Sequence, residues 1–195
     1  QITLLPSPAI SPDTGDETTN WKIYQNKTYG FEIKYPDTVS LFDTKDIDKM
    51  ANLTYIPVCD TYNSVTCFYF PNSKYSKTNF RGAGLSINVL KKNNTEKSCN
   101  TIESPNNQKT NRHINGVIFS TGDQGGAAAG NQNSDTVFRT FYNGTCFELV
   151  ERVTTDSSDV NAPPGTVLSI TETEITAIVA ELDQILTTFK FVEKQ

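Results

Sequence analysis

Acid–base chemistry at neutral pH would depend on one residue, because His113 is the single histidine among 195 residues. A Ser-His-Asp or Cys-His mechanism needs an imidazole, whose ordinary pKa lies near neutrality. His113 stands one residue before Ile114-Asn115-Gly116, where the end of a strand leaves a side chain in water, and no G-x-S-x-G motif is present. An envelope hydrolase that uses His113 is therefore the lowest-ranked of three functions that the sequence suggests.

Four cysteines could bind a metal or form disulfides: Cys59, Cys67, Cys99 and Cys146. None belongs to a C-x-x-C motif, and with a single histidine a tetrahedral zinc site would need scattered ligands. Two disulfides are the better interpretation, and three pairings are possible. The segment CDTYNSVTC resembles two strand ends joined by a turn, which favours Cys59 with Cys67 and leaves Cys99 with Cys146. Such bonds imply an oxidising compartment outside the cytoplasm.

The acidic clusters do not indicate a metal site. The segments DTKDID at 43–48 and DTGDE at 13–17 lack the spacing, the glycine and the terminal glutamate of an EF-hand. Paired carboxylates for glycoside hydrolysis are not selected by any strand spacing. The sequence therefore predicts no metal and no cofactor.

Two segments could form a binding surface. In GDQGGAAAGN, 122–131, Gly125 and Gly126 could present backbone amides to a ligand. No G-K-[ST] follows them, so a mobile connection between strands is predicted. The second segment is CFYFPNSKYSKTNFRG, 67–82, in which alternation directs Phe68 and Phe70 inward and Tyr69 outward. The residues offered there as a binding platform are Tyr69, Tyr75, Phe80 and Arg81.

The composition disfavours nucleic acid as a partner, because the net charge of −5 would repel a phosphate backbone. No stretch reaches the roughly 20 apolar residues of a membrane span, so any signal or membrane anchor is expected to have been removed. In a secretory setting the asparagines of four N-x-[ST] patterns would carry glycans. The asparagines predicted as acceptors are Asn26, Asn52, Asn94 and Asn143.

The first 20 residues are predicted to be an extended stalk or docking tail, because Pro6, Pro8 and Pro12 disfavour regular structure. A single disulfide-stapled domain is predicted over 21–195. The apolar residues of the tail, Ile2, Leu4 and Leu5, could dock on this domain or be donated as a strand to a neighbouring subunit.

Alternating strands dominate the rest of the chain. WKIYQ at 21–25 and YGFEIKYP at 29–36 are predicted to pair, and GLSINVL places alternate apolar residues on one face. Asn115-Gly116 and Asn143-Gly144 each stand between apolar runs, which is the strongest short-range signal for a two-residue hairpin. We therefore expect an α+β fold whose main part is an antiparallel β-sheet.

A strong helix is predicted near the end of the sequence. Thr171 and Glu174 form a capping box, and Ile170 and Ile175 are placed as a hydrophobic staple. Apolar residues recur at helical spacing from 175 to 189, so one stripe should pack on the sheet. The opposite face carries acidic residues, which disfavours a membrane-surface helix. A weaker helix is predicted over 46–52.

The segments YGFEIKYPDTVSLF, INGVIF, CFELV and ELDQILTTFKF occur in this order. Together they resemble a secreted or lipid-anchored domain of bacterial envelopes that is similar in layout to the PsbP family. The resemblance spans about 21–192 and implies an α/β sandwich. It also implies a non-enzymatic accessory role in binding and stabilising membrane complexes.

Three functions follow in rank order. The first is a non-enzymatic binding or assembly-accessory domain at the outer face of the cell membrane, with a protein partner or self-association. The second is a subunit of an extracellular filament that donates residues 1–10 as a strand. The third is the hydrolase that would use His113.

Overall fold

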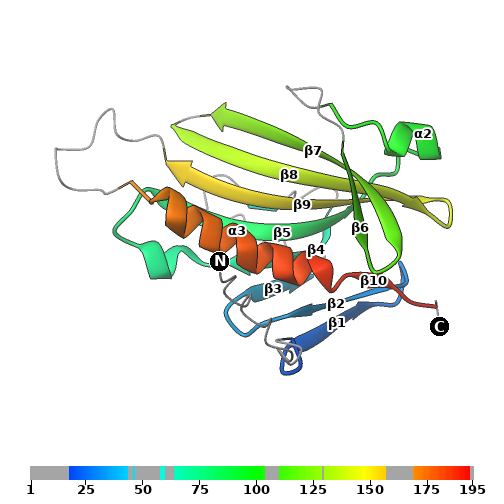
Figure 1. Ribbon diagram of the computed structural model, residues 1–195, viewed down its shortest axis with the longest axis horizontal. Coiled ribbons are helices and arrows are strands. Elements are labelled where there is room, and N and C mark those ends of the chain that lie inside the picture. The colour runs from blue at the N-terminus through cyan, green and yellow to red at the C-terminus, as the bar shows by residue number, and fades with distance from the viewer. Residues whose placement is uncertain are drawn as a thin grey trace, which may run out of the picture.

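The computed structural model describes residues 18–43, 46, 58–59, 64–103, 110–128, 130–156 and 169–193. They form two antiparallel sheets, and a long helix lies across the larger sheet (Figure 1). The three-stranded sheet has the order β1-β2-β10 and consists of β1 (Lys22–Asn26), β2 (Phe31–Tyr35) and β10 (Lys190–Phe191). The predicted α+β class with a mainly antiparallel sheet is confirmed.

The larger sheet has seven strands in the order β3-β4-β5-β9-β8-β7-β6. Its strands are β3 (Ser40–Asp43), β4 (Ser64–Phe70), β5 (Phe80–Val89), β6 (Thr110–Ile114), β7 (Val117–Ala128), β8 (Asn131–Tyr142) and β9 (Thr145–Asp156). The described helices are the 3-10 turn η1 (Asn72–Tyr75), the short α2 (Glu96–Cys99) and the long α3 (Glu172–Thr187). The expected helix over 46–52 lies almost wholly outside the described residues.

Both predicted Asn-Gly hairpins are present. Asn115 and Asn143 have φ of 46°, and the glycines after them have φ of 80° and 76°. Two consecutive positive φ values define the type I′ turn, whose twist matches that of the paired strands. The first turn connects β6 to β7 and the second connects β8 to β9, so local sequence fixes the register of both pairs.

The glycine-rich segment 122–131 differs from its prediction as a mobile connection. Pairing of β7 with β8 continues through Gly125 and Gly126, which lie opposite Ser134 and Asn133. A Cβ at Gly126 would lie 3.0 Å from the Asn133 Oδ1 atom, so glycine leaves room for the Asn133 side chain. The pairing partner across the hairpin therefore outweighs the low strand propensity of glycine.

Helix α3 begins as predicted. The Thr171 hydroxyl accepts a hydrogen bond from the Glu174 backbone N–H, and the Glu174 side chain returns to Thr171. Its apolar stripe is buried at Ile178, Leu182, Ile185 and Leu186. Each such side chain contributes roughly 2 kcal/mol by leaving water, so packing on β5, β9 and β2 holds the helix in place.

Aromatic packing joins the two sheets. Phe31 of β2 is fully buried, and its ring lies 5.4 Å from the ring of Phe189 and 6.4 Å from the ring of Phe147 on β9. Phe189 directly precedes β10, so the end of α3 and the first hairpin share one core. The alternation in YGFEIKYP thus places Phe31 and Ile33 between the sheets.

Both predicted disulfides are present. Cys59 pairs with Cys67, and Cys99 of α2 pairs with Cys146 of β9, at Cα–Cα distances of 6.1 and 5.5 Å. The bonds are compatible with an extracellular protein. Among the described residues, no helix is both long and apolar enough to cross a lipid bilayer.

Candidate functional site

The most unusual polar group in the described part of the chain is the carboxyl of Glu151. This residue lies in the middle of β9, between Leu85 of β5 and Thr136 of β8. Its side chain is on the face of the sheet that α3 covers, and only 6% of the residue is exposed. The Oε1 atom is buried without a hydrogen-bond partner. Leaving a buried polar atom unpaired costs about 1–3 kcal/mol, so such a group indicates a function.

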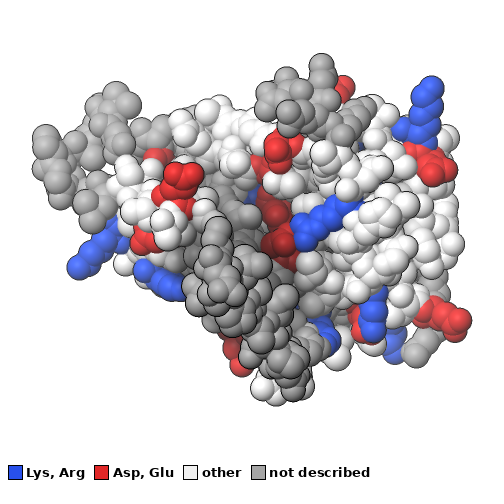
Figure 2. Space-filling model, in the orientation of Figure 1, with Lys and Arg blue, Asp and Glu red and all other residues white. Residues whose placement is uncertain are grey.

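An ion pair lies beside Glu151 and joins β6 to α3. The Arg112 guanidinium donates two hydrogen bonds to the Asp183 carboxylate, NH1 to Oδ1 and NH2 to Oδ2. The guanidinium also lies over the ring of Phe138, 5.6 Å from its centroid. Figure 2 shows acidic side chains meeting a basic one in the middle of this face. Arg112 therefore has its charge engaged by Asp183.

The charges of this cluster set the protonation of Glu151. Burial, and then the negative charge of Asp183, raise the pKa of Glu151 to about 8, while Arg112 opposes the shift. With two carboxyls and one guanidinium, the cluster lacks one positive charge. At neutral pH the Glu151 carboxyl is therefore mostly protonated, as expected for an acid held in a poorly solvated place.

Glu151 forms part of the wall of a cavity of about 200 Å³ between α3 and strands β8 and β9. We call this cavity the Glu151 groove. Strand β8 contributes uncharged polar side chains, whereas α3 and Val153 of β9 contribute apolar ones. Its lining residues are Gln132, Asn133, Ser134, Thr136, Glu151, Val153, Thr155, Ile175 and Val179. A groove with one polar and one apolar wall suits a small amphipathic group.

Sequence reasoning missed this site, although one signal was present. In CFELVERV the residues Phe147, Leu149 and Val153 occupy alternate positions on the core face, and Glu151 interrupts that series. A charged residue at an apolar position of a buried strand is expected to have a purpose. Arg112 and Asp183 carried no such signal, because strand ends and helix faces commonly hold charges.

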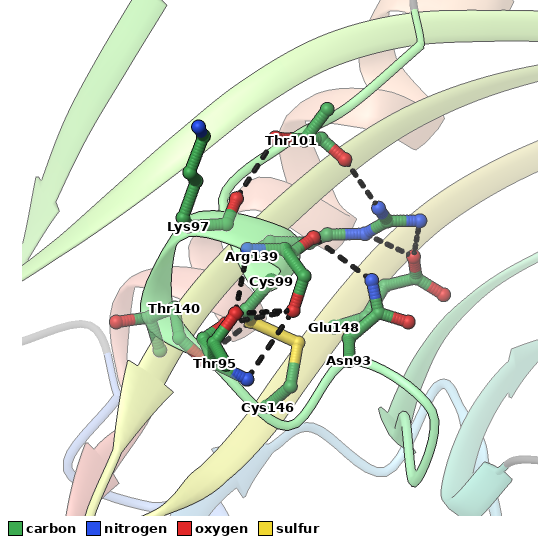
Figure 3. Close-up of a disulfide and its surroundings, with 10 residues drawn as sticks. Asn93, Thr95, Lys97, Cys99, Thr101, Arg139, Thr140, Cys146 and Glu148 are labelled. Carbon is green, nitrogen blue, oxygen red and sulfur yellow. Dashed lines mark hydrogen bonds and ion pairs between the residues drawn. A yellow bond between two sulfur atoms is a disulfide. The ribbon is translucent and has the colours of Figure 1, made fainter.

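A second hollow, of about 530 Å³, lies on the opposite face beside α2 and the Cys99–Cys146 disulfide (Figure 3). Arg139 lies at this hollow, but its Nε donates to Glu148 Oε2 at 2.6 Å and its NH1 donates to the Thr101 carbonyl. Lys97 points away from the disulfide. Because Arg139 is already satisfied, this hollow is the weaker candidate.

The predicted aromatic platform is not an exposed surface. Tyr69 does point away from the main core, but Val58, Cys59 and Phe42 cover it and leave it 6% exposed. Phe80 is buried, and the half-buried Tyr75 packs edge-on against its ring. Tyr69 thus points to the face opposite Phe68 and Phe70, as the alternation predicted, but it is buried there because a segment distant in sequence supplies a second apolar cluster.

The other predicted binding residues are dispersed. Arg81 is exposed and pairs with Asp156 at the end of β9. Gly125 and Gly126 are exposed on β7, outside the lining of both cavities. Hence the structure does not bring Arg81 and the two glycines into one site with the aromatic residues.

His113 is exposed on β6, opposite Ile118, as the sequence predicted. It contributes to the lining of neither cavity described above. In the described ranges, no group of three or more His, Cys, Asp or Glu residues could hold a metal ion. The donated-strand residues Ile2, Leu4 and Leu5 lie outside the described residues, so that prediction stays open.

The glycan predictions need one correction. Asn94 is exposed, but Glu96 follows it two residues later, so the acceptor of that pattern is Asn93. The Asn93 side-chain amide donates to the Ser98 carbonyl at 2.8 Å.

Two further asparagines of the N-x-[ST] patterns lie in turns. Asn26 is half-buried and accepts from the Tyr29 backbone N–H, whereas Asn143 is exposed in the β8–β9 turn. Asn52 lies outside the described residues.

The fold defines the class of protein: an α+β domain in which two antiparallel sheets and the helix α3 enclose the main core. No protein-family model and no curated protein matches the sequence. A crystal structure of a protein from Bacteroides thetaiotaomicron superimposes with a TM-score of 0.50 at 14% identity. The match covers 90% of this chain and 50% of that one, so this chain spans half of its length.

The Saccharomyces cerevisiae Ran-binding protein Mog1p superimposes with a TM-score of 0.45 at 10% identity, over 89% of this chain and 96% of that one. At 14% identity the Bacteroides structure shows a shared β-rich fold alone.

Proposed function

We propose that this protein is a non-enzymatic extracytoplasmic domain that binds a protein partner through the Glu151 groove. The observation that carries the proposal is the buried Glu151 carboxyl, which lines a cavity and has an unpaired oxygen. A core carboxyl without a partner lowers stability, whereas the same group in a binding site can be satisfied by the ligand. The groove therefore has the chemistry of a site that a partner completes.

The setting of the groove supports binding rather than turnover. Its walls are the rigid strands β8 and β9 and the packed helix α3, so the site is largely formed before a ligand arrives. A hydrolase would need His113 beside a carboxylate and a nucleophile, and His113 is exposed on β6 opposite Ile118. The two disulfides and the resemblance to PsbP-like envelope domains, which act as accessory subunits, support an extracytoplasmic role.

Site-specific photocrosslinking in the native host tests the proposal. A photoreactive residue is placed at Gln132, an exposed residue of the groove, and in a matched variant at Lys97, an exposed residue on the opposite face. We expect one reproducible protein adduct from position 132 and none from position 97. The adduct is identified by mass spectrometry of the captured complex.

Three outcomes would overturn the proposal. Lys97 lines the second hollow, so equal capture from both positions would mean that the groove is not the particular site of contact. No capture from position 132 would remove the groove as a site. Adducts between copies that map to residues 1–10 would favour the filament subunit. In parallel, a hydrolytic activity that is lost in His113→Ala would favour the enzyme.

A further inference from the structure

The charges around Glu151 indicate what kind of group would complete the groove. Asp183 faces it from α3, Arg112 faces it from β6, and Asp123 lies on β7 beyond Thr136. From β5 the strand partner is Leu85, which carries no charge. Arg112 is committed to Asp183 by two hydrogen bonds. An ionised Glu151 would therefore lack a counter-charge of its own.

The shape of the groove indicates the rest of the ligand. The apolar side chains of Val153, Ile175 and Val179 lie along it, while amide and hydroxyl groups line β8. Aliphatic stems with a charged end bury their methylene groups against apolar side chains and keep the charge at a polar site. The volume of about 200 Å³ is that of a side chain rather than of an extended polymer.

From these two observations we infer that the Glu151 groove receives the primary ammonium group of a lysine side chain from the protein partner. The ammonium pairs with the Glu151 carboxylate, and the methylene stem lies along Val153, Ile175 and Val179. A divalent cation fits less well, because no group of three potential metal-ligating side chains occurs in the described ranges. This inference rests on the proposed function and specifies its ligand.

Binding of a cation is coupled to a proton. Below pH 8 the free protein holds a proton on Glu151, and a bound ammonium favours the ionised carboxylate, so binding releases that proton. The lysine amine itself stays protonated in this range, with an ordinary pKa of about 10.4. Affinity must therefore rise with pH up to about 8 and then level off.

The affinity for a neutral ligand would fall, not rise, with increasing pH. A sugar hydroxyl or a backbone carbonyl would accept a hydrogen bond from the protonated Glu151 carboxyl, and that donor disappears as pH rises above 8. The direction of the pH dependence therefore distinguishes a cationic from a neutral ligand without knowledge of the natural partner.

The test is calorimetric titration of the full chain with Nα-acetyl-lysine-N-methylamide between pH 6 and pH 8. We expect affinity to rise about 50-fold, because the ionised fraction of Glu151 rises from about 1% to about half. The norleucine analogue, which lacks the ammonium group, should not bind. Carbon NMR of the Glu151 carboxyl should show its pKa falling when the probe saturates the protein.

Two variants locate the effect. Glu151→Gln keeps the shape of the side chain but cannot ionise, so binding should fall at least tenfold and lose its pH dependence. Asp123→Asn removes one negative charge from the same face. Asp123 is not a lining residue of the groove, and the asparagine keeps an oxygen that can accept the hydrogen bond from Thr136, so affinity should change less than twofold. If the Glu151 variant fails to fold, the NMR measurement on the unaltered protein still decides the question.

Equal binding of the norleucine analogue, falling affinity with pH, or no binding would each overturn the lysine inference. Tighter binding of free 1,5-diaminopentane by more than tenfold would overturn a protein-borne source of the ammonium. If the probe fails while crosslinking at position 132 still captures a partner, only the ligand class is wrong. If both fail, the groove is not a binding site.

Discussion

Glu148 and Glu151 stand three residues apart on β9 and point to opposite faces of the same sheet. Both are buried, with 9% and 6% of the residue exposed. Glu148 accepts hydrogen bonds from Arg139 Nε at 2.6 Å and from Asn88 Nδ2 at 3.0 Å. Glu151 Oε1 has no partner. Burial therefore does not distinguish a structural carboxylate from a candidate functional one. The two glutamates differ in the hydrogen-bond donors that surround them.

A disulfide also joins α2 to the face of the sheet on which Glu148 lies. Cys146, two residues before Glu148, holds α2 to the sheet through Cys99. The network continues from Asn88 to Ser64, whose hydroxyl donates to the Asn88 side-chain Oδ1 atom at 2.7 Å. A chain of satisfied polar groups rigidifies its surroundings. We therefore expect substitutions on this face to affect stability, and substitutions at Glu151 to affect binding and pH response.

The largest expected effect is loss of the Cys99–Cys146 disulfide. Replacing both residues by alanine should lower the free energy of unfolding by about 4 kcal/mol, because the bond spans 47 residues and restricts the unfolded chain. Urea denaturation measures the loss. The matched control, alanine at Cys59 and Cys67, spans 8 residues and should lose about 2.5 kcal/mol. Equal losses would contradict the chain-entropy explanation.

The second-largest expected effect is loss of the ion pair between Arg139 and Glu148. Arg139→Met should lower the free energy of unfolding by about 3 kcal/mol, because it leaves the Glu148 carboxylate buried without its cation. Adding Glu148→Gln to that variant removes the unpaired charge and should restore part of the loss. If the double variant is no more stable than the single one, the cost does not come from the stranded charge.

The Glu151 carboxyl should instead make the stability of the protein depend on pH. The pKa of Glu151 is higher in the folded state, about 8, than its ordinary value of 4.5 in the unfolded chain. Its stabilising effect is therefore complete below the unfolded pKa and is lost as pH rises through about 8. From pH 6 to pH 9 the free energy of unfolding should fall on the order of 3 kcal/mol relative to Glu151→Gln. Urea denaturation of both proteins at the two pH values measures this loss. An equal change in the free energy of unfolding of the two proteins would contradict the prediction.

The smallest effect concerns the ion pair beside Glu151. Arg112→Met should cost about 1 kcal/mol, because the Arg112 and Asp183 side chains are both about one-third exposed. The same change removes the one charge that lowers the pKa of Glu151, so that pKa should rise further. Carbon NMR of the Glu151 carboxyl measures the shift, and an unchanged pKa would mean that Arg112 does not act on Glu151.

The contrast between the two glutamates also explains what sequence could predict. The Asn-Gly hairpins, the capping box of α3 and the Cys59–Cys67 bond depend on residues close together in the chain. Their signals are therefore complete within short segments. The pairing of Cys99 with Cys146 could be inferred only because these two cysteines remained after the first pair was assigned.

Other features that join distant segments were not predicted. The strand character of 122–128 depends on its pairing with β8, and the burial of Tyr69 depends on Val58. The candidate site is the extreme case, because Arg112 and Asp183 are 71 residues apart and meet Glu151 only after β6, β9 and α3 have assembled. No local pattern carries that information.

Strand β10 has a consequence for how the chain reaches this state. Lys190 and Phe191 pair with Glu32 and Phe31, and Phe191 stacks on Tyr142 with ring centroids 3.7 Å apart. Because β2 ends at Tyr35 and β10 begins at Lys190, the ribosome makes the third strand of this sheet long after the first hairpin. A lone two-stranded hairpin is marginal in water, so the three-stranded sheet depends on a strand that is made only after all seven strands of the larger sheet.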